Sequence, residues 1–271
     1  MNRYFEIEIE TNSAEDCEML IAGLSEINFY AFEQEENSLK AYIEEKDFDE
    51  EKLKEVLPGA RIFTKKSIEE ENWNQQWESS IQPVTVHDFA AIRPSFHEPI
   101  KNVKYDLIIT PKMSFGTGHH ATTFLMIELM EQIDFQNKSV LDFGTGTGVL
   151  AILAEKMGAS EILAIDYDEW SIRNTIENIE ANNCKNIFVE QKSDLKGIKP
   201  VDIILANINL NVLTNAASAI SSLLKPGSLL LTSGFLLKDE MEMQNIFGLK
   251  NVVKKQVEER NGWLSVLFQK E

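Results

Sequence analysis

Three glycines stand at alternate positions between two apolar runs: Gly144, Gly146 and Gly148. The residues before them suit a buried strand and those after them suit a helix. A glycine turn between a strand and a helix lets the backbone approach a bound ligand closely. A dinucleotide-binding turn has the spacing Gly-x-Gly-x-x-Gly, whereas position 149 here is Val. The spacing therefore predicts a ligand-binding turn and disfavours a nicotinamide-dependent oxidoreductase.

An acidic residue, Asp166, ends the next apolar run, 22 residues after Gly144. A carboxylate at the end of a neighbouring strand can accept hydrogen bonds from both hydroxyls of a ribose. The two features together imply an adenosine-type ligand that lies against Gly144, Gly146 and Asp166. An Asp at the end of a strand also serves as the N-cap of a following helix, and that interpretation stays open here.

An asparagine, Asn207, follows the apolar run 201–206. In an open sheet of parallel strands, ligands lie beyond the carboxyl ends of the strands, which places Asn207 near the reacting centre. Its side-chain oxygen can accept a hydrogen bond from an amine while its nitrogen donates one to a cofactor. The alternative is that Asn207 only caps the helix that follows.

A second unusual segment runs from Met113 to Thr123 and contains two glycines and two adjacent histidines, His119 and His120. Its Gly-x-Gly-x-x-Ala spacing is similar to that of a dinucleotide loop. Residues 111–113 separate it from the strand-like segment 106–109, however, so we predict a lid over the cofactor. Adjacent side chains point apart and no third ligand has a suitable spacing, so we expect no metal site.

The elements that must position these residues follow from the alternation of apolar runs with helical patterns. Buried parallel strands joined by crossover helices are expected, with strands at 140–143, 162–166, 187–189, 201–206 and 229–232 and helices that include Ile172, Ile176 and Ile179 and 210–224. Two more strands, 252–258 and 263–268, flank Asn261-Gly262, which is a strong hairpin signal. Residues 85–271 are therefore predicted to form one α/β domain with a terminal antiparallel pair.

Residues 1–70 are predicted to form a separate small α+β domain. Glutamates alternate with apolar residues from Phe5 to Glu10, as in a strand with one buried face, and Ser13 is placed to cap a helix. Further segments complete the βαββαβ order of a ferredoxin-like fold: strands near 30–34, 39–43 and 61–68 and a helix at 47–57 that Pro58-Gly59 would end. Residues 71–84, which are acidic and contain two tryptophans, are predicted to be a linker.

The charge of the chain bears on its partners. It carries 26 Lys and Arg against 44 Asp and Glu, a net charge of -18, and residues 1–71 alone hold 8 against 20. Such a charge repels phosphate backbones, so nucleic-acid binding is disfavoured and a basic protein partner is favoured. No apolar run approaches the ~20 residues of a membrane span, no export signal is recognisable, and the two cysteines fit no disulfide framework. We therefore expect a cytoplasmic protein without membrane contact.

The segment Phe115 to Thr123 resembles the F-G-T-G-x-H-x-T-T signature of the ribosomal protein L11 methyltransferases. The turn Asp142 to Gly148, Asp166 and Ala206-Asn207-Ile208 follow at the distances expected of that family. The linker, the Arg93-Pro94-Ser95 stretch and the small first domain extend the resemblance over nearly the whole chain. It implies a Rossmann-like seven-stranded methyltransferase domain after the ferredoxin-like domain, with S-adenosylmethionine as the cofactor.

The resemblance also implies roles for residues. Thr123, Gly144, Asp166 and Asn207 would contact S-adenosylmethionine, and no catalytic base is assigned. The implied activity is methylation of lysine side-chain and N-terminal amines of ribosomal protein L11, which the small domain would recognise. Two alternatives stay open: a methyltransferase of the same class that acts on another protein or a small amine, and a non-catalytic adaptor for a basic protein. Asn209, where the family usually has Leu, is the departure that bears on acceptor preference.

Overall fold

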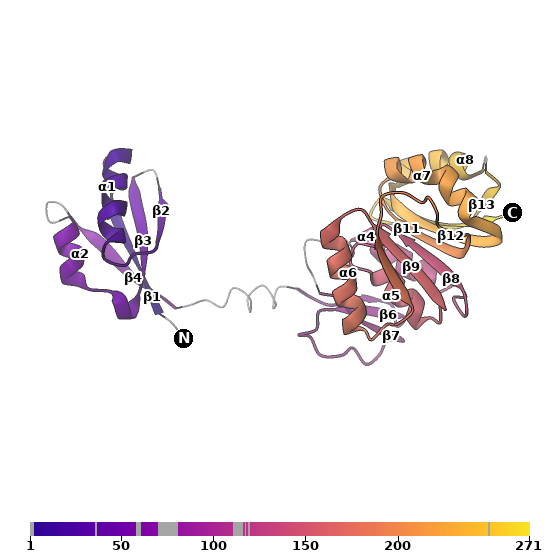
Figure 1. The fold of residues 1–271 in the computed structure, drawn as a ribbon, viewed down its shortest axis with the longest axis horizontal. Helices are drawn as coiled ribbons and strands as arrows, with labels where there is room; N and C mark the ends of the chain where they lie inside the picture. The colour runs from indigo at the N-terminus through magenta and orange to yellow at the C-terminus, as the bar shows by residue number, and fades with distance from the viewer. Residues whose placement is uncertain are drawn as a thin grey trace. The chain divides into compact units, whose positions relative to one another are not determined.

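The chain divides into two compact units, residues 1–80 and 81–271 (Figure 1). This computed structural model describes residues 3–35, 37–57, 61–69, 81–110, 116, 118, 120–248 and 250–271. Residues 71–80 of the predicted linker and the Pro58-Gly59 pair expected to end a helix lie outside the described residues. The predicted domain boundaries at 70 and 84 therefore stay predictions.

The first unit has a four-stranded antiparallel sheet with the order β2-β3-β1-β4. Its elements follow the predicted βαββαβ order of a ferredoxin-like fold: β1 Arg3–Glu10, α1 Ala14–Ser25, β2 Ala31–Gln34, β3 Ser38–Glu44, the 3-10 turn η1 Glu45–Asp47, α2 Glu50–Val56 and β4 Phe63–Glu69. Ile7 and Ile9 of β1 are completely buried against side chains of both helices, as the alternation of the strand predicts.

The starts of the two helices in this unit are set by capping side chains. Ser13 caps α1, because its hydroxyl accepts the N–H of Asp16 at 3.2 Å. The second helix begins at Glu50 and not at residue 47 as predicted. Asp49 is the reason, since its carboxylate accepts the N–H of Glu51 at 3.0 Å and satisfies the first turn of α2.

The second unit contains a seven-stranded sheet with the order β10-β9-β8-β11-β12-β14-β13. Its strands are β8 Ser139–Phe143, β9 Glu161–Asp166, β10 Ile187–Gln191, β11 Val201–Asn207, β12 Leu224–Leu236, β13 Val252–Arg260 and β14 Trp263–Lys270. Strand β14 runs antiparallel to both of its neighbours, β12 and β13, whereas the strands from β10 to β12 pair in parallel. The predicted parallel sheet with a terminal antiparallel pair is therefore confirmed. Asn261 and Gly262, with φ of 54° and 79°, form the predicted turn between β13 and β14.

Helices cover both faces of this sheet (Figure 1). They are α4 Ala121–Met130, α5 Val149–Lys156, α6 Glu169–Ala181, α7 Leu210–Leu223 and α8 Glu240–Gly248, with a 3-10 turn η2 Leu237–Asp239. Ile203 and Leu205 of β11 pack into the core that contains α4 and α5, whereas Ile204 and Ala206 pack into the core that contains α7 and α8. None of the helices in the described part of the chain is long and apolar enough to cross a membrane.

A small three-stranded sheet precedes α4 and was predicted only in part. Its strands are β5 Val84–Val86, β6 Ala90–Arg93 and β7 Tyr105–Ile108. The buried Arg93 guanidinium makes two parallel hydrogen bonds with Asp106 of β7, Nε to Oδ1 at 2.9 Å and Nη2 to Oδ2 at 2.7 Å. Such a bidentate pair holds β6 and β7 in register. Strands of three or four residues are too short to show a period, which is why sequence patterns miss them.

Helix α6 contains Ile172, Ile176 and Ile179, as predicted, but the face that it buries is largely polar. Ile176 is 43% exposed. The residues of α6 that are buried instead are Ser171, Asn174, Thr175 and Asn178. Thr175 and Asn178 bond to backbone groups of other segments, and a helix pattern carries no sign of such partners.

The polar face of α6 connects β7 to the glycine turn. Asn178 accepts the N–H of Thr110 at 2.9 Å and donates to the carbonyl of Thr147 at 2.8 Å. Asn182, just after α6, accepts the N–H of Ile108 at 3.0 Å and donates to the same residue's carbonyl. The amide side chains thus pair with β7 much as a neighbouring strand would.

Candidate active site

The glycine turn after β8 has a backbone conformation that side chains rarely adopt. Gly144, Gly146 and Gly148 have φ of 78°, 58° and 81°, in the left-handed region that favours glycine. The N–H groups of Gly144 and Thr145 both donate to the carbonyl of Ile165 in β9, at 2.9 and 3.0 Å. The turn is therefore fastened to the neighbouring strand, and Gly148 leads directly into α5 as its N-cap.

Asp166, at the end of β9, holds the same turn with its carboxylate. Oδ2 accepts the N–H of Gly146 at 3.0 Å and Oδ1 accepts the N–H of Asp168 at 3.0 Å. Asp166 is not the N-cap of α6, because that role belongs to Asp168, whose carboxylate accepts the N–H of Ser171 at 3.0 Å. Each carboxylate oxygen of Asp166 keeps a lone pair for a further donor. The capping alternative for Asp166 is therefore wrong.

Asn207, at the end of β11, lies next to Thr123 of α4. Its Nδ2 donates to Oγ1 of the completely buried Thr123 at 3.4 Å. Its Oδ1 is buried and has no hydrogen-bond partner among the described residues. The helix that follows is capped by Asn209, whose side-chain oxygen accepts the N–H of Val212 at 3.0 Å. The capping alternative for Asn207 is therefore wrong as well, and the departure at position 209 has a structural role.

Four of the five predicted cofactor residues line one pocket of about 440 Å³. They are Gly144, Gly146, Asp166 and Asn207, and the fifth, Thr123, contacts Asn207. The pocket lies where the carboxyl ends of β8, β9 and β11 meet, which is the place expected for a ligand of such a sheet. A second hollow of about 590 Å³ shares Phe143, Ser193 and Val212 with it. The structure thus brings the predicted residues together, while their contact with the cofactor stays a prediction.

Several residues that line the pocket were not predicted: Phe143, Tyr167, Asp168, Ser171, Lys192, Ser193, Ile208, Asn209 and Val212. A signal was available for Lys192 and Ser193, because they directly follow β10 and its carboxyl end meets the same edge of the sheet. Ile208 and Val212 carry no such signal, since apolar residues at the start of a helix usually belong to the core.

Beneath the pocket, Asp142 of β8 is a completely buried carboxyl group. Burial raises its pKa to about 7, against the opposing effect of the hydrogen bond that Thr145 donates to Oδ2 at 2.7 Å. The other oxygen, Oδ1, has no partner among the described residues. A buried carboxylate is costly in such surroundings, so the neutral form is favoured up to near neutral pH.

Part of the segment predicted as a lid is described. The carbonyl of Gly116 accepts the hydroxyl of Thr147 at 2.8 Å, which joins this segment to the glycine turn. The rest of the segment before the histidines, Met113 to Phe115, lies outside the described residues, as do Thr117 and His119. Closure over the cofactor therefore stays a prediction.

His120, the second of the adjacent histidines, caps α4. Its Nδ1 accepts the N–H of Thr122 at 3.3 Å, and its ring meets the ring of Trp263 edge to face with centroids 4.8 Å apart. Over the described ranges, no three His, Cys, Asp or Glu side chains come together in a group that could hold a metal ion.

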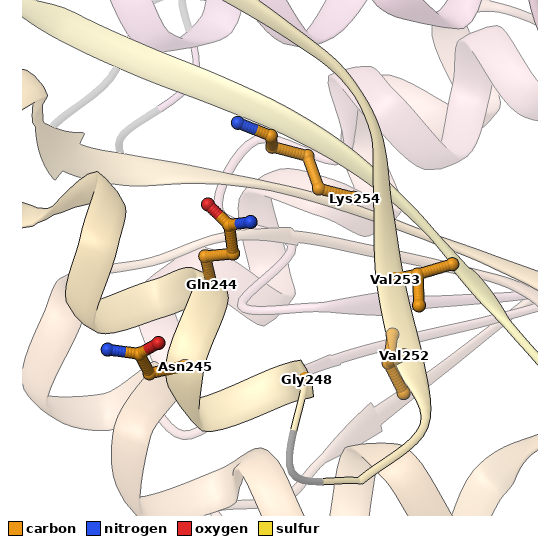
Figure 2. A pocket seen from close by; sticks show the side chains of 6 residues that line it. All are labelled: Gln244, Asn245, Gly248, Val252, Val253 and Lys254. Carbon is orange, nitrogen blue, oxygen red and sulfur yellow. The ribbon is translucent and has the colours of Figure 1, made fainter.

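Another hollow lies between α8 and β13 (Figure 2) and is lined by Gln244, Asn245, Gly248, Val252, Val253 and Lys254. None of the predicted cofactor residues lines it. The ammonium group of Lys254 is already paired with Glu240 at 2.7 Å. This hollow therefore has no part in the candidate site.

Solved structures share the fold of this chain. That of the ribosomal protein L11 methylase from Lactobacillus delbrueckii subsp. bulgaricus covers 70% of this chain and 100% of its own with a TM-score of 0.65 at 24% identity. That of a methyltransferase from Pyrococcus furiosus covers 60% of this chain and 89% of its own with a TM-score of 0.52 at 17% identity. These likenesses show that the fold is one shared with methyltransferases.

The sequence comparisons are more specific. The model of the family "Ribosomal protein L11 methyltransferase (PrmA)" matches residues 3–271. Relatives named ribosomal protein L11 methyltransferase include that of Bacteroides fragilis, which is 38% identical over 98% of this chain and 99% of its own. That of Chlorobaculum tepidum is 36% identical over 93% of this chain and 92% of its own. The chain therefore belongs to the ribosomal protein L11 methyltransferase family, which confirms the predicted resemblance.

Replacement of Asp166 by Ala should weaken S-adenosylmethionine binding by about 2 kcal/mol, because a charged acceptor of hydrogen bonds is lost. The substitution also removes the carboxylate oxygen that accepts the N–H of Gly146. Isothermal titration measures it, with Glu169→Ala as the control, since Glu169 is exposed and lies outside the pocket lining. Unchanged affinity in Asp166→Ala would show that the ribose does not lie against this carboxylate.

The buried Asp142 predicts a dependence of stability on pH. Its folded-state pKa of about 7 lies above the unfolded value, so the folded chain binds more protons between pH 4 and 7 and its stability falls as the pH rises through that range. Between pH 5 and 8, the free energy of unfolding should therefore fall by roughly 2 kcal/mol less in Asp142→Asn than in the parent protein. Urea unfolding at both pH values measures this. Asp88→Asn, at an exposed position, should behave like the parent protein. Equal pH dependence in all three proteins would contradict the prediction.

Proposed function

We propose that this protein transfers methyl groups from S-adenosylmethionine to lysine side-chain and N-terminal amines of ribosomal protein L11. The observation that carries the proposal is the match of the family model over residues 3–271, which includes both units of the chain. The relatives at 36 to 38% identity are named for that substrate. The reacting methyl group is supplied by the sulfonium of S-adenosylmethionine when that cofactor is bound.

The pocket residues fit such a cofactor. The carboxylate of Asp166 has lone pairs left for two ribose hydroxyls. Gly144 and Gly146 expose backbone where side chains would fill the approach. An adenosine-type sulfonium with a free amino group is cationic, and the two carboxylates of Asp166 and Asp168 outnumber the single ammonium of Lys192 in the pocket lining.

Asn207 is suited to orient the acceptor amine. Its buried Oδ1 without a partner costs free energy until a donor reaches it, and an amine is such a donor. An amide oxygen accepts a hydrogen bond but does not take the proton away, so its role would be orientation of the nitrogen. A lysine amine, with an ordinary pKa near ~10.4, has to reach its neutral form before it attacks, and a water-poor channel favours that form. Most of the rate would then come from alignment.

Purified L11 should be labelled when it is mixed with the enzyme and S-adenosylmethionine that carries a tritiated methyl group. Mass spectrometry of the product locates the methylated amines. Asn207→Ala should slow labelling by about tenfold or more, because the amine loses its alignment. Asn245→Ala removes the same side chain from the exposed surface of α8 (Figure 2) and should leave the rate unchanged.

The other functions give different results in the same assay. Labelling of another protein or of a small amine, with L11 unlabelled, would show a different acceptor. Tight binding of L11 with no transfer to any acceptor would favour an adaptor. Equal rates for Asn207→Ala and the parent enzyme would reject the role of Asn207.

We also propose that the first unit recognises the substrate and presents it. Residues 1–71 hold 8 basic against 20 acidic side chains, which suits a basic ribosomal protein. All of the predicted cofactor residues lie between Thr123 and Asn207, in the second unit. Each unit has a core of its own, so loss of the first leaves the core of the second intact.

Deletion of residues 1 to about 70 should therefore leave cofactor affinity near normal but lower kcat/KM for L11 by several orders of magnitude, since alignment of an acceptor is worth about 7 kcal/mol or more. Calorimetry measures cofactor binding and the tritium assay measures turnover. A free lysine-rich peptide serves as the control and should be methylated poorly by both proteins. A folded truncated enzyme that methylates L11 at the full-length rate would contradict the recognition role.

A further inference from the structure

Strand β12 contains an irregular residue, Gly234, where it pairs with β14. Ser233 pairs with Ser265 and Phe235 pairs with Leu264, so Gly234 is an extra residue in one strand, as in a β-bulge. Its φ is 98°, a conformation that favours glycine. A bulge with such a residue commonly changes the course of a strand near a functional site.

The bulge brings Gly234 against the backbone of Ile208, the residue that follows Asn207. A Cβ at Gly234 would lie 2.1 Å from the carbonyl oxygen of Ile208 and 2.6 Å from its carbonyl carbon. These are backbone atoms, which cannot rotate out of the way as a side chain can. Strands β11 and β12 are neighbours, and Asn207 itself pairs with Ser233. Any side chain at position 234 must therefore displace the Ile208 peptide.

The glycine turn also approaches Ile208 closely. A Cβ at Gly144 would lie 2.4 Å from Cγ2 of Ile208. Because β8 and β12 flank β11, the end of β11 lies between two glycines that approach it from the two neighbouring strands. Asn207 and Asn209, on either side of Ile208, both line the pocket, and Asn209 also caps α7. A shift of this peptide would therefore move the backbone next to both asparagines.

We propose that Gly234 is a positioning residue for methyl transfer, which acts on Asn207 through the Ile208 peptide. This inference rests on the proposed function, because it concerns the alignment of the cofactor and the acceptor amine. Gly234 does not line the pocket, so its effect is transmitted and not direct. A displacement on the order of 1 Å at a residue remote from the chemistry can cost about 10²-fold in rate.

The rival explanation is that Gly234 only allows a left-handed backbone in β12. Gly227 offers a matched comparison, because it lies on the same strand with φ of 85° and a Cβ there would meet nothing within 4 Å. Alanine at either position has to adopt a conformation that L residues disfavour. Only alanine at 234 also collides with the Ile208 backbone. The two substitutions therefore separate conformational strain from displacement of the peptide.

The test compares Gly234→Ala with Gly227→Ala in the full-length protein. Calorimetry with S-adenosylmethionine gives Kd, and the tritium assay gives kcat and KM for L11. Gly234→Ala should raise Kd and lower kcat by about tenfold or more, whereas Gly227→Ala should change neither by more than about twofold. Trimethylamine N-oxide, which favours burial, keeps an unstable variant folded, and circular dichroism gives the folded fraction used to correct Kd. Equal effects of the two substitutions, or parent values for folded Gly234→Ala, would overturn the proposal.

A double-mutant cycle identifies the residue through which Gly234 acts. If Gly234 acts through Asn207, the variant that carries both Gly234→Ala and Asn207→Ala should have the Kd and kcat of the more impaired single variant. Independent, multiplicative losses in Kd and kcat would overturn that part of the proposal. The calorimetric cycle needs no acceptor protein. A parent enzyme that binds the cofactor but leaves L11 unlabelled would thus reject the proposed substrate while the role of Gly234 is still decided by Kd.

Discussion

The carboxyl edge of the large sheet depends on two hydrogen bonds to one carboxylate, that of Asp166. It accepts the N–H of Gly146 from the turn after β8 and the N–H of Asp168 from the turn after β9. A turn made of glycines has few side chains by which it can be held, so backbone groups have to supply its anchors. Ionised acceptors form the stronger hydrogen bonds, which suits this task. The shape of the turn and the group proposed to bind ribose are therefore parts of one interaction.

Around this edge the protein uses buried amides where most helices use apolar side chains. Asn178 and Asn182 join β7 to the glycine turn, and Thr175 donates to the carbonyl of Gly146 at 2.9 Å. Buried polar groups are costly unless they are paired, so few alternative arrangements of these segments are tolerated. The small sheet and the glycine turn are in this way fixed to a common helix, although β7 and the turn are far apart in the sequence.

Much of this architecture could be predicted from the sequence, because its signals are local. Buried strands are apolar on both faces, Asn261-Gly262 specifies a tight turn, and a strand-end acid after a glycine turn indicates the ligand edge. What sequence patterns could not decide was which of two nearby polar residues caps a helix. Asp168 and Asn209 take that role and leave Asp166 and Asn207 to face the pocket. The polar face of α6 and the pairing of Arg93 with Asp106 depend on partners distant in the chain, which no local pattern records.

The hydroxyl of Thr147 joins two segments that lie 31 residues apart, the glycine turn and the segment before α4. The contact is close, since a Cβ at Gly116 would lie 2.6 Å from that oxygen. A movement of the turn on ligand binding would therefore displace Gly116 as well. Where two ligands each favour one arrangement of such a contact, thermodynamic linkage requires that each changes the affinity for the other by the same factor. A ligand that moves the glycine turn and a ligand that binds against Gly116 would therefore influence each other through the hydroxyl of Thr147.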